Sequence, residues 1–249
     1  MLVCLLDAPD KASEYLKRGV PHDIEPDPRT KCYVQNIYSN KDPDRLIIRV
    51  EYWGETNPLE PTAYGRFVGR LSSLEKEIAE VPYATVVLDS VTALELAARY
   101  YSENNVNKFN AKGEETREGR LHYAFSMKAC EQLVMTRWPN LIGTNAIVIA
   151  HYEEHQDESD DGERIVSKKT IAVPGKLAGR IGTQFSEVWR VYVDESGQRV
   201  LQTTARPRNQ FNCKTSIDLP DGSYPHYKII ETLFEQEDGA KPVDTPDQG

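Results

Sequence analysis

An acid and a hydroxyl stand at the end of a short apolar run, because Asp89 and Ser90 directly follow residues 85–88. The next residues, 91–98, carry apolar side chains at helical spacing, so the pattern predicts a strand that passes directly into a helix. Open α/β sheets place ligand chemistry at the carboxyl ends of their parallel strands. In nucleotide-hydrolysing folds, an acid at this position organises the water shell of a magnesium ion. The alternative is a buried strand whose Asp89 caps the following helix.

A second group of candidate residues, His151, Glu154 and His155, follows an apolar run at residues 145–150. It has the H-x-x-E-H spacing of one class of zinc peptidase. That chemistry needs both histidines on one face of a rigid helix, with a third ligand further along the chain. The residues from Glu153 to Glu163 have the composition of an acidic loop. Zinc-dependent hydrolysis is therefore the less favoured alternative.

The sequence lacks a recognisable phosphate-binding loop. Such loops read G-x-x-x-x-G-K-[ST], because backbone amides cradle the phosphates while the lysine and the hydroxyl reach phosphate and magnesium. The Gly-Lys pair of this chain, Gly175-Lys176, is followed by Leu177 and has Thr170 in place of the first glycine. The sequence therefore identifies no site for the β- and γ-phosphates of a nucleotide.

Charge is distributed unevenly along the chain. The formal net charge is −9, but residues 164–214 contain ten Lys or Arg and three Asp or Glu. A basic segment in an acidic protein favours an anionic partner such as nucleic acid or nucleotide phosphate. The alternative is that these cations alternate on solvated strand faces.

Composition also bears on the compartment. The cysteines form no C-x-x-C pair, which fits reduced thiols in the cytoplasm: Cys4, Cys32, Cys130 and Cys213. No apolar run approaches the roughly 18 residues needed to cross a membrane. The apolar residues 1–6 lack a basic leader, so they predict a strand and not a signal peptide.

Strands and helices are predicted to alternate over the first 150 residues. The predicted strands are residues 1–7, 45–53, 85–89 and 145–150, and the predicted helices are 11–18, 63–80, 91–101 and 121–137. This alternation is typical of a mainly parallel α/β sheet with flanking helices. Residues 20–31 and 102–119 are predicted to be loops.

The last hundred residues follow a different pattern. Strands at 187–193 and 198–205, separated by a turn at 194–197, predict an antiparallel hairpin. A last strand is expected around 227–233. We expect one core domain over residues 1–235 and a disordered acidic tail over residues 236–249.

Taken in order, these pieces resemble the RecA-like recombinase and ATPase group, and especially the phage AAA-type ATPases related to single-strand annealing proteins. Residues 1–10 with 15–19 resemble the second strand and following helix of that core, and residues 85–90 resemble its Walker B strand. Residues 147–151 resemble the next strand, which ends in a polar sensor of the γ-phosphate. Residues 174–179 with 185–190 resemble the stretch after the second DNA-binding loop.

The chain departs from this family in two places. The family begins with a strand, the P-loop and a helix, and this chain starts after all three, so we expect a truncated product or a misplaced start. The family's catalytic glutamate is expected just after the second strand, where this sequence has Pro9, with Asp10 as the nearest acid. The resemblance therefore implies a RecA-like sheet without its first strand, P-loop and helix, and weak or absent hydrolysis by this chain.

The resemblance also assigns a role to each candidate residue, with ATP and Mg²⁺ as cofactors. Asp89 would hold magnesium-bound water, supported by Ser90, and His151 would sense the γ-phosphate. Asp10 would stand nearest the catalytic position. Cations that reach a neighbouring subunit's nucleotide would come from Arg206, Arg208 and Lys214.

The implied partner is single-stranded DNA. The segment between His151 and Val173 would face it, with phosphate contacts from Lys168, Lys169 and Lys176 whose affinity falls with salt. The resemblance implies a DNA-recombination ATPase of a phage or prophage that assembles into a ring or filament. The other hypotheses are a non-catalytic, degenerate RecA-like subunit that binds DNA or a complete ATPase, and a fragment without activity.

Overall fold

The computed structural model describes the backbone of residues 1–6, 22–26, 33–39, 41–54, 57, 59–80, 83–106, 113, 119–141, 143–158, 164–205, 213–217 and 219–223. Side chains are described for the same residues except 22–26, 33 and 154–169. The chain divides into two compact units. The first comprises Met1–Glu153 with Ile171–Ile181, and the second comprises Glu154–Thr170 with Gly182–Gly249.

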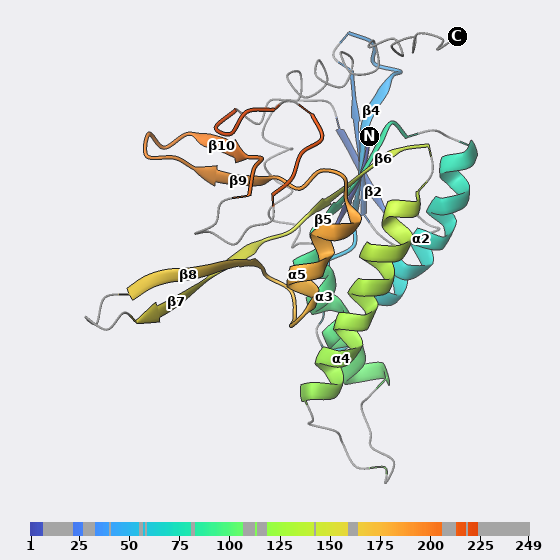
Figure 1. The fold of residues 1–249 in the computed structure, drawn as a ribbon. Helices are drawn as coiled ribbons and strands as arrows, with labels where there is room; N and C mark the ends of the chain where they lie inside the picture. Colours follow the sequence, from blue (N-terminus) through green and yellow to red (C-terminus); the bar gives the residue numbers. More distant parts are fainter. Residues whose placement is uncertain are drawn as a thin grey trace, which may run out of the picture. The chain divides into compact units, whose positions relative to one another are not determined.

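A six-stranded sheet forms the centre of the first unit, with strand order β2-β3-β4-β1-β5-β6 (Figure 1). The strands are β1 (Leu2–Leu5), β2 (His22–Pro26), β3 (Tyr33–Tyr38), β4 (Leu46–Tyr52), β5 (Thr85–Asp89) and β6 (Asn145–Ile149). Strands β4, β1, β5 and β6 run parallel, whereas β3 is antiparallel to β4 and β2 is antiparallel to β3. The mainly parallel sheet predicted from the sequence is confirmed.

Helices connect the parallel strands. They are α2 (Ala63–Glu80), α3 (Val91–Tyr101) and α4 (Gly119–Cys130), followed by the short α5 (Leu177–Arg180). Two segments have π-helical geometry, η1 (Ser102–Val106) and η2 (Glu131–Arg137), and two are 3₁₀ turns, η3 (Trp138–Asn140) and η4 (Ile181–Gln184). The predicted helix 63–80 is confirmed. The predicted helix 121–137 begins two residues earlier and continues in wider π-helical turns after Cys130.

The apolar face of α2 packs into the core of this unit. Its buried residues include Phe67, Leu71, Leu74 and Ile78, which are the positions that helical spacing predicted. The ring of Phe67 lies with its centroid 6.2 Å from that of Trp53 and 6.3 Å from that of Trp138. A column of large side chains therefore joins the end of β4, the middle of α2 and the end of the α4–η3 helical segment.

Three predicted loops differ from the structure. The predicted loop 20–31 contains β2, which extends the sheet together with the unpredicted β3. The predicted acidic loop Glu153–Glu163 begins as β7 (Tyr152–Glu158), which pairs with β8 (Arg164–Ile171) in a separate two-stranded sheet. The predicted loop 102–119 begins with the π-helical η1. Charged residues lower strand propensity, but pairing with a neighbouring strand outweighs that preference.

The second unit contains the predicted antiparallel hairpin. Strands β9 (Arg190–Val193) and β10 (Arg199–Gln202) pair across a turn in which Asp194 Oδ1 accepts hydrogen bonds from the backbone of Ser196 and Gln198. Gly197 adopts φ +80° in this turn, a conformation that glycine tolerates. The predicted helix 11–18, strand 227–233 and tail 236–249 lie outside the described residues. None of the helices in the described ranges is both long and apolar enough to span a bilayer.

Candidate functional site

The carboxyl ends of β1, β5 and β6 meet at one edge of the sheet because the three strands are parallel. Leu5 lies opposite Asp89 in the strand register, and Asp89 lies opposite Ile149. Just beyond β1, the Leu6 N–H donates to the Asp89 carbonyl over 2.6 Å. Asp89 is thereby fixed at the end of a central strand with its side chain half-buried. This is the edge at which open α/β sheets bind their ligands.

Ser90 performs the capping role that the sequence left open for Asp89. Its hydroxyl accepts a hydrogen bond from the Ala93 N–H over 3.2 Å, and its carbonyl accepts one from the Leu94 N–H over 3.0 Å. The residue is fully buried, in extended conformation, at the start of α3, and the Asp89–Ser90 peptide bond is cis. The Ser90 hydroxyl therefore satisfies the first turn of the helix. Its support of a magnesium ion stays a prediction.

His151 lies one strand over, two residues beyond the residue that pairs with Asp89. Its backbone N–H donates to Thr92 Oγ1 over 3.2 Å, and its carbonyl accepts from the Ala172 N–H over 2.9 Å. The imidazole is exposed. Because Thr92 belongs to the first turn of α3, this contact fastens the end of β6 to the helix that begins beside Asp89. The structure thus brings together three predicted site residues, Asp89, Ser90 and His151.

Thr92 is a positioning residue that sequence reasoning missed. Its signal was a hydroxyl in the first turn of the helix after the acid, where we assigned no role. The Thr92 hydroxyl oxygen accepts this hydrogen bond from the backbone N–H of His151, which lies 59 residues further along the chain. Such a long-range pair leaves no trace in local spacing, so the hydroxyl could not have been matched with His151 without the sheet order.

The donor set at this edge fits magnesium and a nucleotide better than a metal held by protein ligands alone. Mg²⁺ prefers oxygen ligands and is held by one or two carboxylates together with water and substrate phosphates. Asp89 supplies one such carboxylate, next to the N-terminus of the eleven-residue α3, where the helix dipole favours negative charge. Within the described residues, no three His, Cys, Asp or Glu side chains cluster so that they could hold a metal ion.

The zinc-peptidase alternative loses its structural basis. Glu154 and His155 belong to β7, an extended strand, and His151 directly precedes it. The backbone of this segment is extended, whereas this chemistry requires its ligands on a helix. The side chains of Glu154 and His155 lie outside those that the structure describes.

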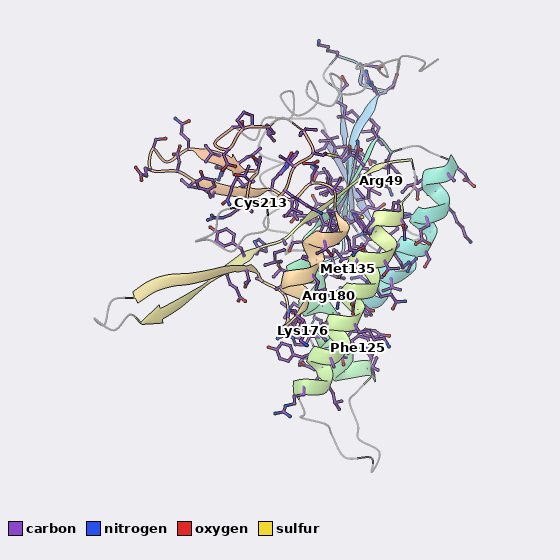
Figure 2. All side chains as sticks on the ribbon, viewed as in Figure 1. Arg49, Phe125, Met135, Lys176, Arg180 and Cys213 are labelled. Carbon is purple, nitrogen blue, oxygen red and sulfur yellow. The ribbon has the colours of Figure 1, made fainter. Side chains whose placement is uncertain are left out.

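The predicted DNA-binding residues belong to two segments. Lys176 is exposed in the turn before α5 (Figure 2). In the same turn, Gly175 has φ +56° and lies near the side chain of Met127 of α4. Arg180 of α5 pairs with Glu131 of η2 over 2.9 Å. Lys168 and Lys169 belong to β8, and their side chains are outside the described set.

The remaining predicted cations and acid are less defined. Lys214 is exposed in the second unit, where its backbone forms an isolated antiparallel bridge with Val188. Asp10, Arg206 and Arg208 lie outside the described residues. Their predicted roles stay predictions.

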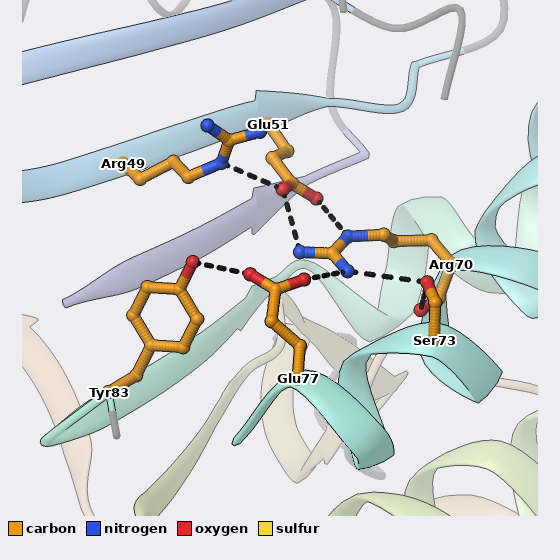
Figure 3. A network of polar contacts seen from close by, with 6 residues as sticks. All are labelled: Arg49, Glu51, Arg70, Ser73, Glu77 and Tyr83. Carbon is orange, nitrogen blue, oxygen red and sulfur yellow. Dashed lines mark hydrogen bonds and ion pairs between the residues drawn. The ribbon is translucent and has the colours of Figure 1, made fainter. Parts of the chain in front are cut away.

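A buried ion network, which the sequence analysis also missed, joins β4 to α2 (Figure 3). The fully buried Glu51 accepts hydrogen bonds from Arg70 Nε over 2.8 Å and Nη2 over 2.9 Å, and from Arg49 Nε over 3.0 Å. Arg70 Nη1 also donates to Glu77 over 2.6 Å. The available signal was a charge at two core positions, Glu51 within an apolar strand and Arg70 on the apolar face of a helix.

Opposing effects set the ionisation of this network. Burial alone would raise the pKa of Glu77, but hydrogen bonds from Arg70 and Tyr83 outweigh it, so the pKa is lowered. Burial and the hydrogen bond to Glu77 raise the pKa of Tyr83. Glu77 therefore stays ionised beside Arg70 to lower pH than a free glutamate would. The two hydrogen bonds from the Arg70 guanidinium to the buried Glu51 carboxylate hold α2 against β4.

The fold and the candidate site together define an α/β protein with a mainly parallel sheet. One central strand of this sheet ends in an acid, and a helix starts directly after it. A family model described as an AAA domain matches residues 35–213, well over half of the chain. The chain belongs to this AAA domain family, a family of AAA-type P-loop ATPases that generally bind ATP and Mg²⁺. No curated protein and no solved structure matches it.

Proposed function

We propose that this chain is the core of an ATPase-type protein that handles single-stranded DNA in phage recombination. The observation that carries the nucleotide part is the placement of Asp89 and His151 at the ends of adjacent parallel strands, with Thr92 between them at the start of α3. Family membership supports the ATPase-type function. The DNA part rests on the basic segment 164–214 and on the resemblance of the sequence to phage recombination ATPases.

Each site residue has a distinct task in this proposal. The Asp89 carboxylate holds water bound to the magnesium ion, and the imidazole of His151, which is exposed, senses the γ-phosphate. Magnesium supplies charge neutralisation to the phosphates when bound. Arg206, Arg208 and Lys214 supply positive charge to a neighbouring subunit in a ring or filament, an effect worth on the order of 10³-fold in rate.

DNA binding is assigned to Lys168, Lys169 and Lys176. Three phosphate contacts predict that the logarithm of the binding constant falls with the logarithm of salt concentration with a slope of about −2 for single strands. Strand β7, which pairs with β8, is rich in acidic residues, so we expect the affinity of one copy for DNA to be weak.

We expect this 249-residue chain to hydrolyse ATP at background rates, because its sequence contains no G-x-x-x-x-G-K-[ST] loop. Steady-state phosphate release, measured with and without single-stranded DNA, tests this directly. Turnover above background that disappears in Asp89→Ala would contradict the expected deficiency, and it would show at the same time that Asp89 is catalytic.

A second candidate is a non-catalytic RecA-like subunit. Two features of the sequence favour it: no phosphate-binding loop is recognisable, and segment 164–214 is basic. It predicts salt-dependent binding of single-stranded DNA without nucleotide, unchanged by ATP and Mg²⁺. A fluorescence-anisotropy titration of labelled oligonucleotide separates the two candidates. Affinity that increases when Mg²⁺ and ATP are added would favour the ATPase core.

A further inference from the structure

An aromatic ring on α4 is stacked against an arginine of α3. The guanidinium carbon of Arg99 lies 4.1 Å from the centroid of the Tyr123 ring, and Tyr123 is 47% exposed. A guanidinium over the face of an aromatic ring is attracted by the negative charge density of that face. Arg99 therefore covers one face of the ring, and the opposite face is the one on which a flat ligand can stack.

Arg99 is itself fixed by the buried carboxylate of Glu95. Arg99 Nη2 donates to both oxygens of Glu95, over 2.8 and 2.7 Å, and Ser126 Oγ of α4 donates to Glu95 Oε1 over 2.7 Å. Glu95 is 5% exposed, so this pair is largely shielded from water. Contacts between α3 and α4 thus fix the Tyr123 ring in the free protein. A side chain that is already ordered loses little conformational entropy on binding.

Cations lie near Tyr123 in both directions along α4. Arg120 is exposed three residues before Tyr123, and residues at this spacing share a face of a helix. Met127 belongs to the same face, four residues after Tyr123. The turn that contains Gly175 and the exposed Lys176 lies near the Met127 side chain. An aromatic ring between cations suits single-stranded nucleic acid, because bases stack on the ring while the cations contact phosphates.

We propose that Tyr123 stacks on an unpaired base of single-stranded DNA, with Arg120 and Lys176 on the flanking phosphates. The inference rests on the DNA binding proposed above, and it adds a residue that contacts a base. The charge of Arg99 is paired with Glu95, so Arg99 positions the ring and does not serve as a phosphate contact. Every base has a π-face, so stacking of this kind tolerates any sequence.

A comparison of two strands separates stacking from charge. Fluorescence anisotropy measures binding of the full chain to labelled oligothymidylate and to an abasic strand of the same length, which keeps the phosphates and lacks the bases. Tyr123→Ala should lower the affinity for oligothymidylate about tenfold, the usual order of magnitude for one stacked base. The same variant should bind the abasic strand as the wild type does, because that strand offers nothing to stack.

Three further variants serve as controls. Tyr123→Phe keeps the ring and should retain the wild-type affinity for oligothymidylate. Leu121→Ala should leave binding unchanged, since Leu121 is 44% exposed on the same helix but lies two residues from Tyr123, on a different face. Lys176→Ala removes one phosphate contact, so it should weaken binding of both strands equally and reduce the salt slope by about 0.7.

The outcomes distinguish this inference from the proposed function. Equal losses of affinity for the two strands in Tyr123→Ala would show that the residue acts through the structure of α4 and would overturn the inference. Unchanged binding of oligothymidylate by Tyr123→Ala would overturn it as well, and in both cases the proposed DNA binding stands. A wild-type chain that binds neither strand would overturn the DNA part of the proposed function together with this inference.

Discussion

The β4 side and the β6 side of the central sheet differ in which side chains they bury and which they expose. On the β4 flank, the charged side chains Glu51 and Arg70 are buried and paired, and the sheet continues into the antiparallel β3 and β2. On the β6 flank, isoleucines are exposed, and β6 is the last strand of the sheet among the described residues. Buried charges that pair with one another have a structural role, because their hydrogen bonds are made within the fold. The chemistry proposed for this protein lies instead at the strand ends that Asp89 and His151 occupy.

The largest expected effect comes from breaking the buried network on the β4 flank. Arg70→Met removes the two hydrogen bonds from Arg70 to the buried Glu51 and should lower the free energy of unfolding by about 3–5 kcal/mol, because the buried carboxylate loses its bidentate partner and keeps the contact with Arg49. Urea denaturation followed by circular dichroism measures this loss.

Arg137→Met serves as the control for that variant. Arg137 pairs with Glu75 on the surface, so its loss should cost less than about 1 kcal/mol. Equal losses in the two arginine variants would show that burial of the Glu51–Arg70 pair has no special importance.

A smaller effect is expected at the start of α3. Ser90→Ala removes the side-chain cap and should cost about 1 kcal/mol, whereas Ser90→Gly should cost only a few tenths. Thermal unfolding of the two variants gives the comparison. If alanine were tolerated as well as glycine at this position, the capping assignment would be wrong.

The smallest expected effect is the pH dependence from Glu77. The pKa of Glu77 is lowered in the folded protein from 4.5, so its contribution to stability is present above pH 4.5 and is lost as pH falls through the folded pKa. Glu77→Gln should therefore flatten the decline in unfolding free energy on acidification. A variant that declines as steeply as the wild type would place the responsible carboxylate elsewhere.

The sequence predicted correctly those helices and strands whose residue pattern lies within a single segment of the chain. Helix α2 was bounded correctly because its apolar residues recur at helical spacing, and β5 passes into α3 as its sequence indicated. Strands β2 and β7 were missed because most of their residues are charged or polar, so that pairing with the next strand along the chain, and not local propensity, makes them strands. The same limit applies to the site, where the Thr92–His151 contact depends on sheet order.

Binding of nucleotide at Asp89 is the most direct test of the central claim. Asp89→Asn keeps the shape of the side chain and removes its charge, and the exposed Asp44→Asn is the control. In a titration with a fluorescent ATP analogue, the wild type and Asp44→Asn should both bind weakly, and their binding should require Mg²⁺. Asp89→Asn should show no such binding. Mg²⁺-dependent binding of equal strength in Asp89→Asn would contradict the assignment of this strand end as the magnesium–nucleotide site.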